Sequence, residues 1–206
     1  MCLFPTFRHN PKYRENKKNG GVIPPIRDNR VLLVPTGCGK CIECRKQKAR
    51  GWQQRLLEDV RHNKNGRFVT FTFSDQSIAK LVQEEKLQGK SGYVLDNGIA
   101  KLAVRRFLER WRKKFKKSVR HWLVTELGHN GTENIHLHGI LWTDEKVQTI
   151  REIWGYGFIW CRYNDEPTYV SEQTVNYITK YIMKTDYKNR EYKPIILNSA
   201  GIGAIS

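Results

Sequence analysis

The sequence has no uninterrupted apolar run approaching the ~18–20 residues that are needed to cross a bilayer. Its first residues, MCLFPTFRHN, also lack the charged and then apolar layout of a secretory signal. Acidic residues are few, because 20 Asp and Glu stand against 37 Lys and Arg and leave a formal net charge of +17. We therefore expect no membrane partner and no secretion, and nucleic acid is a more natural ligand than a small acidic molecule.

Cysteine is scarce as well, with five in 206 residues. Three of them, Cys38, Cys41 and Cys44, follow one another in a C-x-x-C-x-x-C pattern. An odd number crowded in this way is not typical of a disulfide framework and favours a reducing compartment, so the cytoplasm is expected. Cys161 lies in an apolar stretch, where a buried and inert thiol is expected.

The N-terminal part of the chain divides into an arm and a helix. Residues 1–35 carry Pro, Gly, Asn and Lys without periodicity and predict an extended arm, with one short strand over Val31–Val34. From Arg45 to Val60, apolar residues recur at three- and four-residue spacing, which predicts an amphipathic helix. The polar run 62–66 ends it.

The remaining elements are predicted from β-branched runs, helical spacing and turn residues. Strands are expected over 67–73, 121–127, 135–142 and 157–163, and helices over 98–120, 144–154 and 170–184, the last with Ser171 as N-cap. The polar segment 128–132 suits a hairpin connection, and the tail after Tyr187 shows no closing element.

This order of elements predicts an α+β, ferredoxin-like sandwich in which helices pack on one antiparallel sheet, preceded by a cysteine-containing arm and helix. The expected parts are 1–65, with the arm, the cysteines and the first helix; 66–187, the core; and 188–206, a tail.

The predicted helix 98–120 is strongly basic, since residues 101–120 hold ten Lys or Arg and a single acid, Glu109. A cationic face with so little compensation indicates contact with a nucleic-acid backbone. The residues expected to bind DNA are Lys101, Arg105, Arg106, Arg110, Arg112, Lys113, Lys114, Lys116 and Lys117.

Two histidines alternate with Leu137 on the strand 135–142, so His136 and His138 project from the same face. Glu126 on the neighbouring strand is expected to place its carboxylate beside them. Two imidazoles and a carboxylate suit Mn²⁺ or Mg²⁺, with coordination positions left for phosphate oxygens. By itself, an H-x-H strand is more often a pair of half-buried histidines than a catalytic site.

Two tyrosines lie one turn apart on the predicted final helix. Tyr177 and Tyr181 share a face, with Lys180 and Lys184 beside them, while the apolar residues of the helix form a separate arc that would dock on the sheet. The tyrosines therefore need not be core, although the helix alone favours an exposed aromatic pair that covers the sheet edge. The lysines are candidate cations for chemistry or solvated charges on an exposed face.

These motifs together resemble the HUH endonucleases, and more closely the replication initiators of microviruses, which are small phages with circular single-stranded DNA. The corresponding motifs are a strand with Thr (Phe71-Thr72-Phe73), the His136-Leu137-His138 strand and the helix with Tyr177 and Tyr181. Three N-terminal segments are also similar to segments of microvirus initiators: MCLFP, NPKYRENKKNGG and GCGKCIECRKQKARGW. Such initiators are usually longer, which leaves open whether the C-terminus is truncated.

The resemblance implies a metal-dependent, site-specific endonuclease that starts rolling-circle replication. A tyrosine would attack one phosphodiester at the phage origin and form a 5′-phosphotyrosyl link, and the second tyrosine would permit strand joining. The implied partners are single-stranded DNA at the origin and the host helicase and DNA polymerase, in the cytoplasm of the bacterial host.

Cys2 is a natural fourth thiolate for Cys38, Cys41 and Cys44, because an N-terminus like that of the initiators can fold back onto them. Four thiolates predict structural Zn²⁺. An iron–sulfur cluster and reduced cysteines without metal remain alternatives.

The string VPTGCGK at 34–40 mimics a phosphate-binding loop, but Cys41 stands where Ser or Thr would hold Mg²⁺, so nucleotide hydrolysis is not expected. Two other functions stay open. One is a non-catalytic, zinc-stapled, basic nucleic-acid-binding protein, and the other is a transposase- or relaxase-like HUH enzyme.

Overall fold

The computed structural model describes residues 2–128, 134–161, 169–184 and 191–204. The chain forms two compact units, Met1–Lys48 and Ala49–Ser206. Three sequence expectations fall wholly or partly outside the described residues: the hairpin connection after residue 128, the end of the strand 157–163, and the boundary at 187. None of the described helices combines the length and apolar character that a membrane span requires.

The first unit is a two-stranded antiparallel sheet with three short 3-10 helices. Strand β1 (Thr6–His9) pairs with β2 (Leu33–Thr36), and the 3-10 helices cover Pro11–Tyr13, Lys17–Asn19 and Asn29–Leu32. The strand expected over 31–34 starts later because the Asp28 side chain caps the turn that begins at Asn29. Strand β1 was not predicted.

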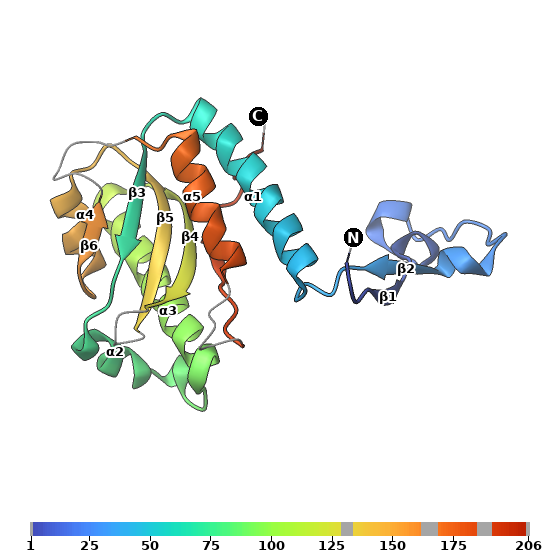
Figure 1. Cartoon of the computed structure of the whole chain (residues 1–206), viewed down its shortest axis with the longest axis horizontal. Coiled ribbons are helices and arrows are strands. Elements are labelled where there is room, and N and C mark those ends of the chain that lie inside the picture. The colour runs from blue at the N-terminus through green and yellow to red at the C-terminus, as the bar shows by residue number, and fades with distance from the viewer. Residues whose placement is uncertain (1, 129–133, 162–168, 185–190, 205–206) are drawn as a thin grey trace. The chain divides into compact units, whose positions relative to one another are not determined.

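The second unit is built on a five-stranded antiparallel sheet in the order β6-β3-β5-β4-β7 (Figure 1). The strands are β3 (Gly66–Phe71), β4 (Arg120–Leu127), β5 (Ile135–Trp142), β6 (Ile159–Cys161) and β7 (Ile196–Asn198). Strand β5 lies between β3 and β4, and β3 lies between β5 and β6, which is the split βαβ arrangement of ferredoxin-like folds. The predicted α+β class is confirmed.

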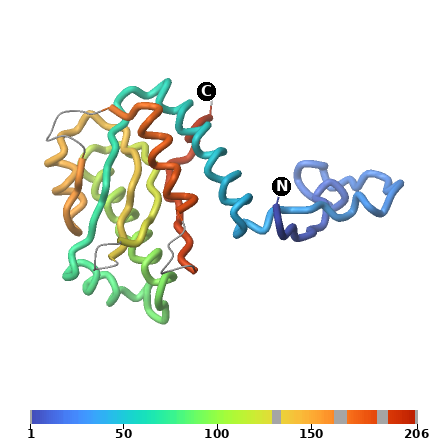
Figure 2. The backbone as a smooth tube through the Cα atoms, in the orientation of Figure 1, coloured from blue at the N-terminus to red at the C-terminus, as the bar shows by residue number. Residues whose placement is uncertain are grey.

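Helices cover both faces of this sheet. Helices α2 (Asp75–Val82), α3 (Gly92–Phe115) and α4 (Val147–Trp154) pack on the face that carries Leu137 and Leu141 of β5. Helix α5 (Glu172–Met183) and the part of α1 (Ile42–His62) from Ala49 onward pack on the face that carries Ile140 and Trp142. Figure 1 shows α5 in front of the sheet and α3 behind it, and the tube in Figure 2 follows the same path.

Several elements differ from the sequence expectations. Helix α3 starts at Gly92 and ends at Phe115 rather than at residue 120, because Lys116 turns to a positive φ of 56° and closes the last turn. Helix α2 and strand β7 were not predicted. The expectation of a tail without a closing element is wrong, since β7 pairs with β4 and completes the edge of the sheet.

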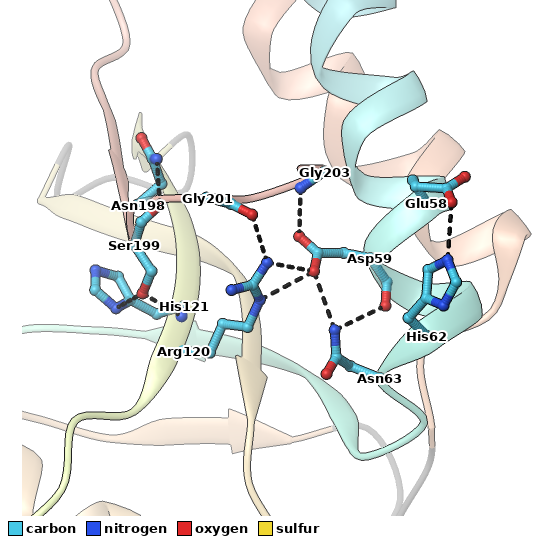
Figure 3. A network of polar contacts seen from close by, with 10 residues as sticks. All are labelled: Glu58, Asp59, His62, Asn63, Arg120, His121, Asn198, Ser199, Gly201 and Gly203. Carbon is cyan, nitrogen blue, oxygen red and sulfur yellow. Dashed lines mark hydrogen bonds and ion pairs between the residues drawn. The ribbon is translucent and has the colours of Figure 1, made fainter. Parts of the chain in front are cut away.

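The C-terminal segment is held against the end of α1 by hydrogen bonds that centre on the buried carboxylate of Asp59 (Figure 3). Arg120 of β4 donates to Asp59 Oδ1 at 2.9 Å from Nε and at 2.6 Å from its second amino group, which also donates to Gly201 O at 2.8 Å. The Gly203 amide donates to Asp59 Oδ2 at 2.9 Å. One carboxylate thus joins α1, the sheet and the tail.

We expect Asp59→Ala to lower the free energy of unfolding by about 3 kcal/mol, because it leaves the guanidinium of Arg120 without its buried counter-ion. Urea denaturation measures the difference. The matched control is Glu58→Ala, next to Asp59 on α1, where the half-buried carboxylate pairs with the exposed His62 at 2.9 Å and the expected loss is below about 1 kcal/mol. Equal losses of unfolding free energy in the two variants would contradict a stabilising role for the Asp59 contacts.

Candidate active site

The predicted site residues come together on the α5 face of the sheet. In the register of β4 with β5, Glu126 lies opposite His136 and Val124 lies opposite His138, and β3 places Thr70 on the other side of His138. Because side chains alternate along a strand, the two imidazoles, the carboxylate and the threonine hydroxyl share one face. The two-residue spacing in each strand is the reason the set converges.

His138 is the centre of a chain of polar contacts. Its Nε2 lies 2.7 Å from Glu126 Oε2, and its Nδ1 lies 2.9 Å from the Thr70 hydroxyl, so both ring nitrogens are engaged and the ring is held in one orientation. Lys184, just after α5, donates to the other oxygen of Glu126. Burial acts to raise the pKa of Glu126, but the hydrogen bonds from His138 and Lys184 outweigh it and hold that pKa below its ordinary value.

His136 lies at the edge of this set of polar contacts. Its ring centroid lies 6.5 Å from that of His138, and it packs so closely on Gly128 that a Cβ there would meet the ring at 2.8 Å. Burial, and then the neighbouring His138, lower the pKa of His136 and favour the neutral imidazole that binds metals. The potential ligand atoms of Glu126, His136 and His138 do not all lie within 4.8 Å of one another.

Tyr181 lies over His138, and Tyr177 adjoins Tyr181. Their hydroxyl oxygens are 2.8 Å apart, and the ring of Tyr181 stacks on that of His138 with centroids 4.3 Å apart and an interplanar angle of 8°. Tyr177 is 51% exposed, so its phenol faces solvent. Burial, followed by the hydrogen bond with Tyr177 and the charge of Glu126, raises the pKa of Tyr181 well above its ordinary value.

The two predicted lysines are placed differently. Lys184 contacts Glu126 and lies 5.7 Å from the centroid of the Tyr181 ring, so it adds positive charge inside the site. Lys180 is exposed on α5. The predicted N-cap of this helix is confirmed, because Ser171 Oγ accepts from the amide of Thr174 and fixes where the helix begins.

Sequence reasoning named Thr72 as part of a motif but did not identify the threonine that contacts His138, and it missed an aromatic residue. The hydroxyl that reaches His138 belongs to Thr70, whereas Thr72 lies beyond the end of β3 and donates to Phe158 O at 2.8 Å. Phe68 lies on the site's face of β3, with its ring stacked 6.5 Å from that of His138. The alternation of β3 could have grouped Phe68, Thr70 and Thr72, but only the register with β5 selects among them.

The basic helix lies on the other side of the sheet from the tyrosines, with the α2 and α4 layer. Its charges are compensated more than the sequence indicated, because Arg106 pairs with Glu84 at 2.8 Å and Arg105 pairs with Glu109 at 3.0 Å. Arg110 donates to the carbonyls of Ile153 and Trp154 and thereby holds the end of α4. Exposed cations remain along it at Lys101, Arg112, Lys113, Lys114, Lys116 and Lys117.

A separate candidate metal centre lies in the first unit. The sulfur atoms of Cys2, Cys38, Cys41 and Cys44 all lie within 4.8 Å of one another, and no other described group of three or more such side chains meets that limit. Two of the separations are 3.8 Å and 4.0 Å, close to the ~3.8 Å between sulfurs around tetrahedral Zn²⁺ with Zn–S bonds of about 2.3 Å. The N-terminus thus folds back as expected, and the cluster could hold a metal such as Zn²⁺.

Backbone amides favour the thiolate form of Cys38 and Cys41 in this cluster. The amides of Lys40 and Cys41 donate to Cys38 Sγ at 3.4 Å and 3.3 Å, and backbone hydrogen bonds from Leu3 and Cys44 lower the pKa of Cys41 to about 6. Because thiolates are the species that bind metals, these contacts suit a metal site.

We expect the purified protein to carry about one zinc ion per chain and Cys38→Ser/Cys41→Ser to lose it, because two thiolates cannot complete a tetrahedral site. Elemental analysis measures the metal, and limited proteolysis should then cut residues 1–48 of the variant faster. Cys161→Ser, outside the cluster, is the control and should keep its zinc. Iron in place of zinc, or equal metal in both variants, would argue against the assignment.

Comparison with known proteins adds one match. Residues 66–186, more than half of the chain, match the family described as Replication-associated protein ORF2/gene-2 protein. The matched segment begins with β3 and contains every residue of the site on the sheet and α5. No curated protein and no solved structure matches the chain significantly.

Proposed function

Because the chain belongs to the Replication-associated protein ORF2/gene-2 protein family, a family of rolling-circle replication initiators, we propose that it nicks and rejoins single-stranded DNA through a tyrosine. The observation that carries this proposal is the pair of phenols 2.8 Å apart, of which Tyr181 stacks on the imidazole of His138, the ring that contacts the carboxylate of Glu126. The microvirus resemblance narrows the proposal to initiation at the origin of a circular single-stranded DNA phage in the bacterial cytoplasm, with the host helicase and polymerase as partners.

Glu126, His136 and His138 fit a divalent ion by the chemistry of their donors, two imidazoles and a carboxylate on one face. The carboxylate already binds a cation, the ammonium of Lys184, so its environment favours positive charge. When bound there, Mn²⁺ or Mg²⁺ would polarise the scissile phosphate. The hydrogen bond between the Thr70 hydroxyl and the ring of His138 would keep that ligand oriented.

In the first step, the phenol oxygen of one tyrosine bonds to phosphorus, and the bond from phosphorus to the 3′ oxygen breaks. The phenol gives its proton to water, and the leaving oxygen takes a proton from water to become a 3′-hydroxyl. The second phenol, 2.8 Å away, lies within hydrogen-bond distance of the attacking oxygen and helps to hold it in position. Lys184 adds a positive charge beside it.

The paired arrangement also suits the reverse reaction. A free 3′-hydroxyl attacks the phosphotyrosine, the phosphodiester forms again, and the phenol leaves with a proton. Because the phosphotyrosyl bond retains the energy of the ester, joining requires no nucleotide cofactor. With two tyrosines, one strand end can remain covalently held while the second phenol attacks a new origin.

Helix α3 lies on the opposite face of the sheet from the tyrosines, so its contacts with DNA would differ from those at the scissile phosphate. Its cationic face points away from the tyrosines, since the sheet lies between them. We propose that α3 contributes salt-dependent affinity for DNA outside the scissile segment.

A covalent-adduct assay tests the function. The protein is incubated with labelled single-stranded segments that tile the cognate phage genome, with Mn²⁺ or Mg²⁺, and is separated under denaturing conditions. We expect a protein–DNA band with one segment, accompanied by a fragment with a 3′-hydroxyl, and loss of both with EDTA. Tight binding without an adduct on any segment would favour the non-catalytic nucleic-acid-binding protein instead.

A further inference from the structure

We propose that an aromatic pocket beside Tyr177 holds an unpaired nucleobase of the DNA strand that enters the site. This inference rests on the proposed function and extends it to how the strand is held. The pocket has a volume of about 400 Å³ and is lined mainly by Phe68, Trp160, Tyr169 and Tyr177. Its size falls in the range of sites that enclose small flat ligands.

The pocket is assembled from three parts of the second unit. Phe68 comes from β3, Trp160 from the edge strand β6, and Tyr177 from α5. Tyr169 is fixed beside them by a β-bridge to Arg67. Three of the rings remain open to solvent, with Trp160 at 45%, Tyr169 at 54% and Tyr177 at 51% exposure. So many exposed aromatic rings in one cavity indicate a binding surface rather than core.

The lining chemistry selects a base rather than a phosphate. None of the described residues that line the pocket carries a formal charge, so a phosphate would find no counter-ion there. Aromatic faces stack on any base, and Gln173 adds an amide that can both donate to and accept from a base edge. The face of the sheet that bears the tyrosines thus binds the strand by stacking, while the cations of α3 lie on the opposite face.

The pocket is continuous with the reacting groups. Phe68 contacts Trp160 edge-on at 6.0 Å and Tyr177 edge-on at 6.0 Å, and it also stacks toward His138 at 6.5 Å. A base between Trp160 and Tyr177 would therefore belong to a nucleotide next to the scissile phosphate. Such a contact would set the position of the backbone relative to the phenol.

The experiment compares a 20-nucleotide oligo-dT with an abasic oligomer of the same length and charge. Anisotropy titrations should show that the protein prefers the oligomer with bases by about 5- to 150-fold for one stacked base. Trp160→Ala and Tyr169→Ala should each reduce this ratio, whereas Phe158→Ala, an exposed aromatic outside the pocket, should leave it unchanged. The abasic oligomer should bind equally to all four proteins.

The outcomes separate this inference from the proposed function. A ratio near one in the parent protein, or an equal ratio in all variants, overturns the pocket assignment even if the adduct forms. Conversely, a reduced ratio in Trp160→Ala supports the pocket even if no adduct is found. Because both replaced side chains are about half exposed, thermal melts should confirm that the variants fold as the parent does.

Discussion

Replacing both tyrosines, as Tyr177→Phe/Tyr181→Phe, should reduce the covalent DNA adduct by at least about three orders of magnitude. The phenol oxygens are the only atoms removed, and these are the atoms that would bond to phosphorus. Since the rings remain, the stacking of residue 181 on His138 and the packing of α5 should persist. Denaturing electrophoresis of reactions with labelled origin DNA measures the adduct, and binding should change less than about threefold.

The single variants test the division of labour between the phenols. One of Tyr177→Phe and Tyr181→Phe should still form an adduct but fail to release and close the strand, because the second phenol is needed for the reciprocal transfer. Tyr156→Phe is the matched control, since this hydroxyl contacts Arg110 on the α3 face of the sheet. Undiminished adduct in the double variant would exclude both residues as nucleophiles.

Replacing His138 by alanine should lower the cleavage rate by about a thousandfold or more while largely preserving DNA affinity. This side chain contacts Glu126, Thr70 and Tyr181 at once, so its loss removes a candidate metal ligand and the ring against which the tyrosine is positioned. Single-turnover rates at saturating protein separate cleavage from binding.

His62→Ala is the matched control for this change, because His62 forms only an exposed pair with Glu58 on α1 and should leave the rate unchanged. A proportional loss of affinity and rate in His138→Ala would instead indicate a structural role. Thr70→Val should give a smaller loss than His138→Ala, since it frees one ring nitrogen without removing the ring.

Part of the site's arrangement could be predicted from the residue spacing within single strands and helices. The alternation of β5 predicted that His136 and His138 share a face, and the helical spacing of Tyr177 and Tyr181 predicted that their side chains adjoin. Both periodicities are properties of a single segment. The α+β class followed in the same way from the order of the periodic segments.

The choice of partners across strands could not be anticipated. Whether Thr70 or Thr72 reaches His138 depends on how β3 is aligned with β5, because the two share a face and a shift of the register by two residues would place Thr72 opposite His138. The contribution of Phe68 to the site was missed for the same reason. Strand β7 is too short to be recognised alone, since it is stabilised by pairing with the edge of β4.

The sequence by itself identified the candidate catalytic side chains, because residue types and their spacing within one strand or helix are local. Only the tertiary structure decided that α3 faces away from the tyrosines and that Glu126 binds both His138 and Lys184. It alone brought rings from β3, β6 and α5 into one pocket. These relations join residues far apart in the chain, and they are set by strand register and by which face of the sheet each helix buries.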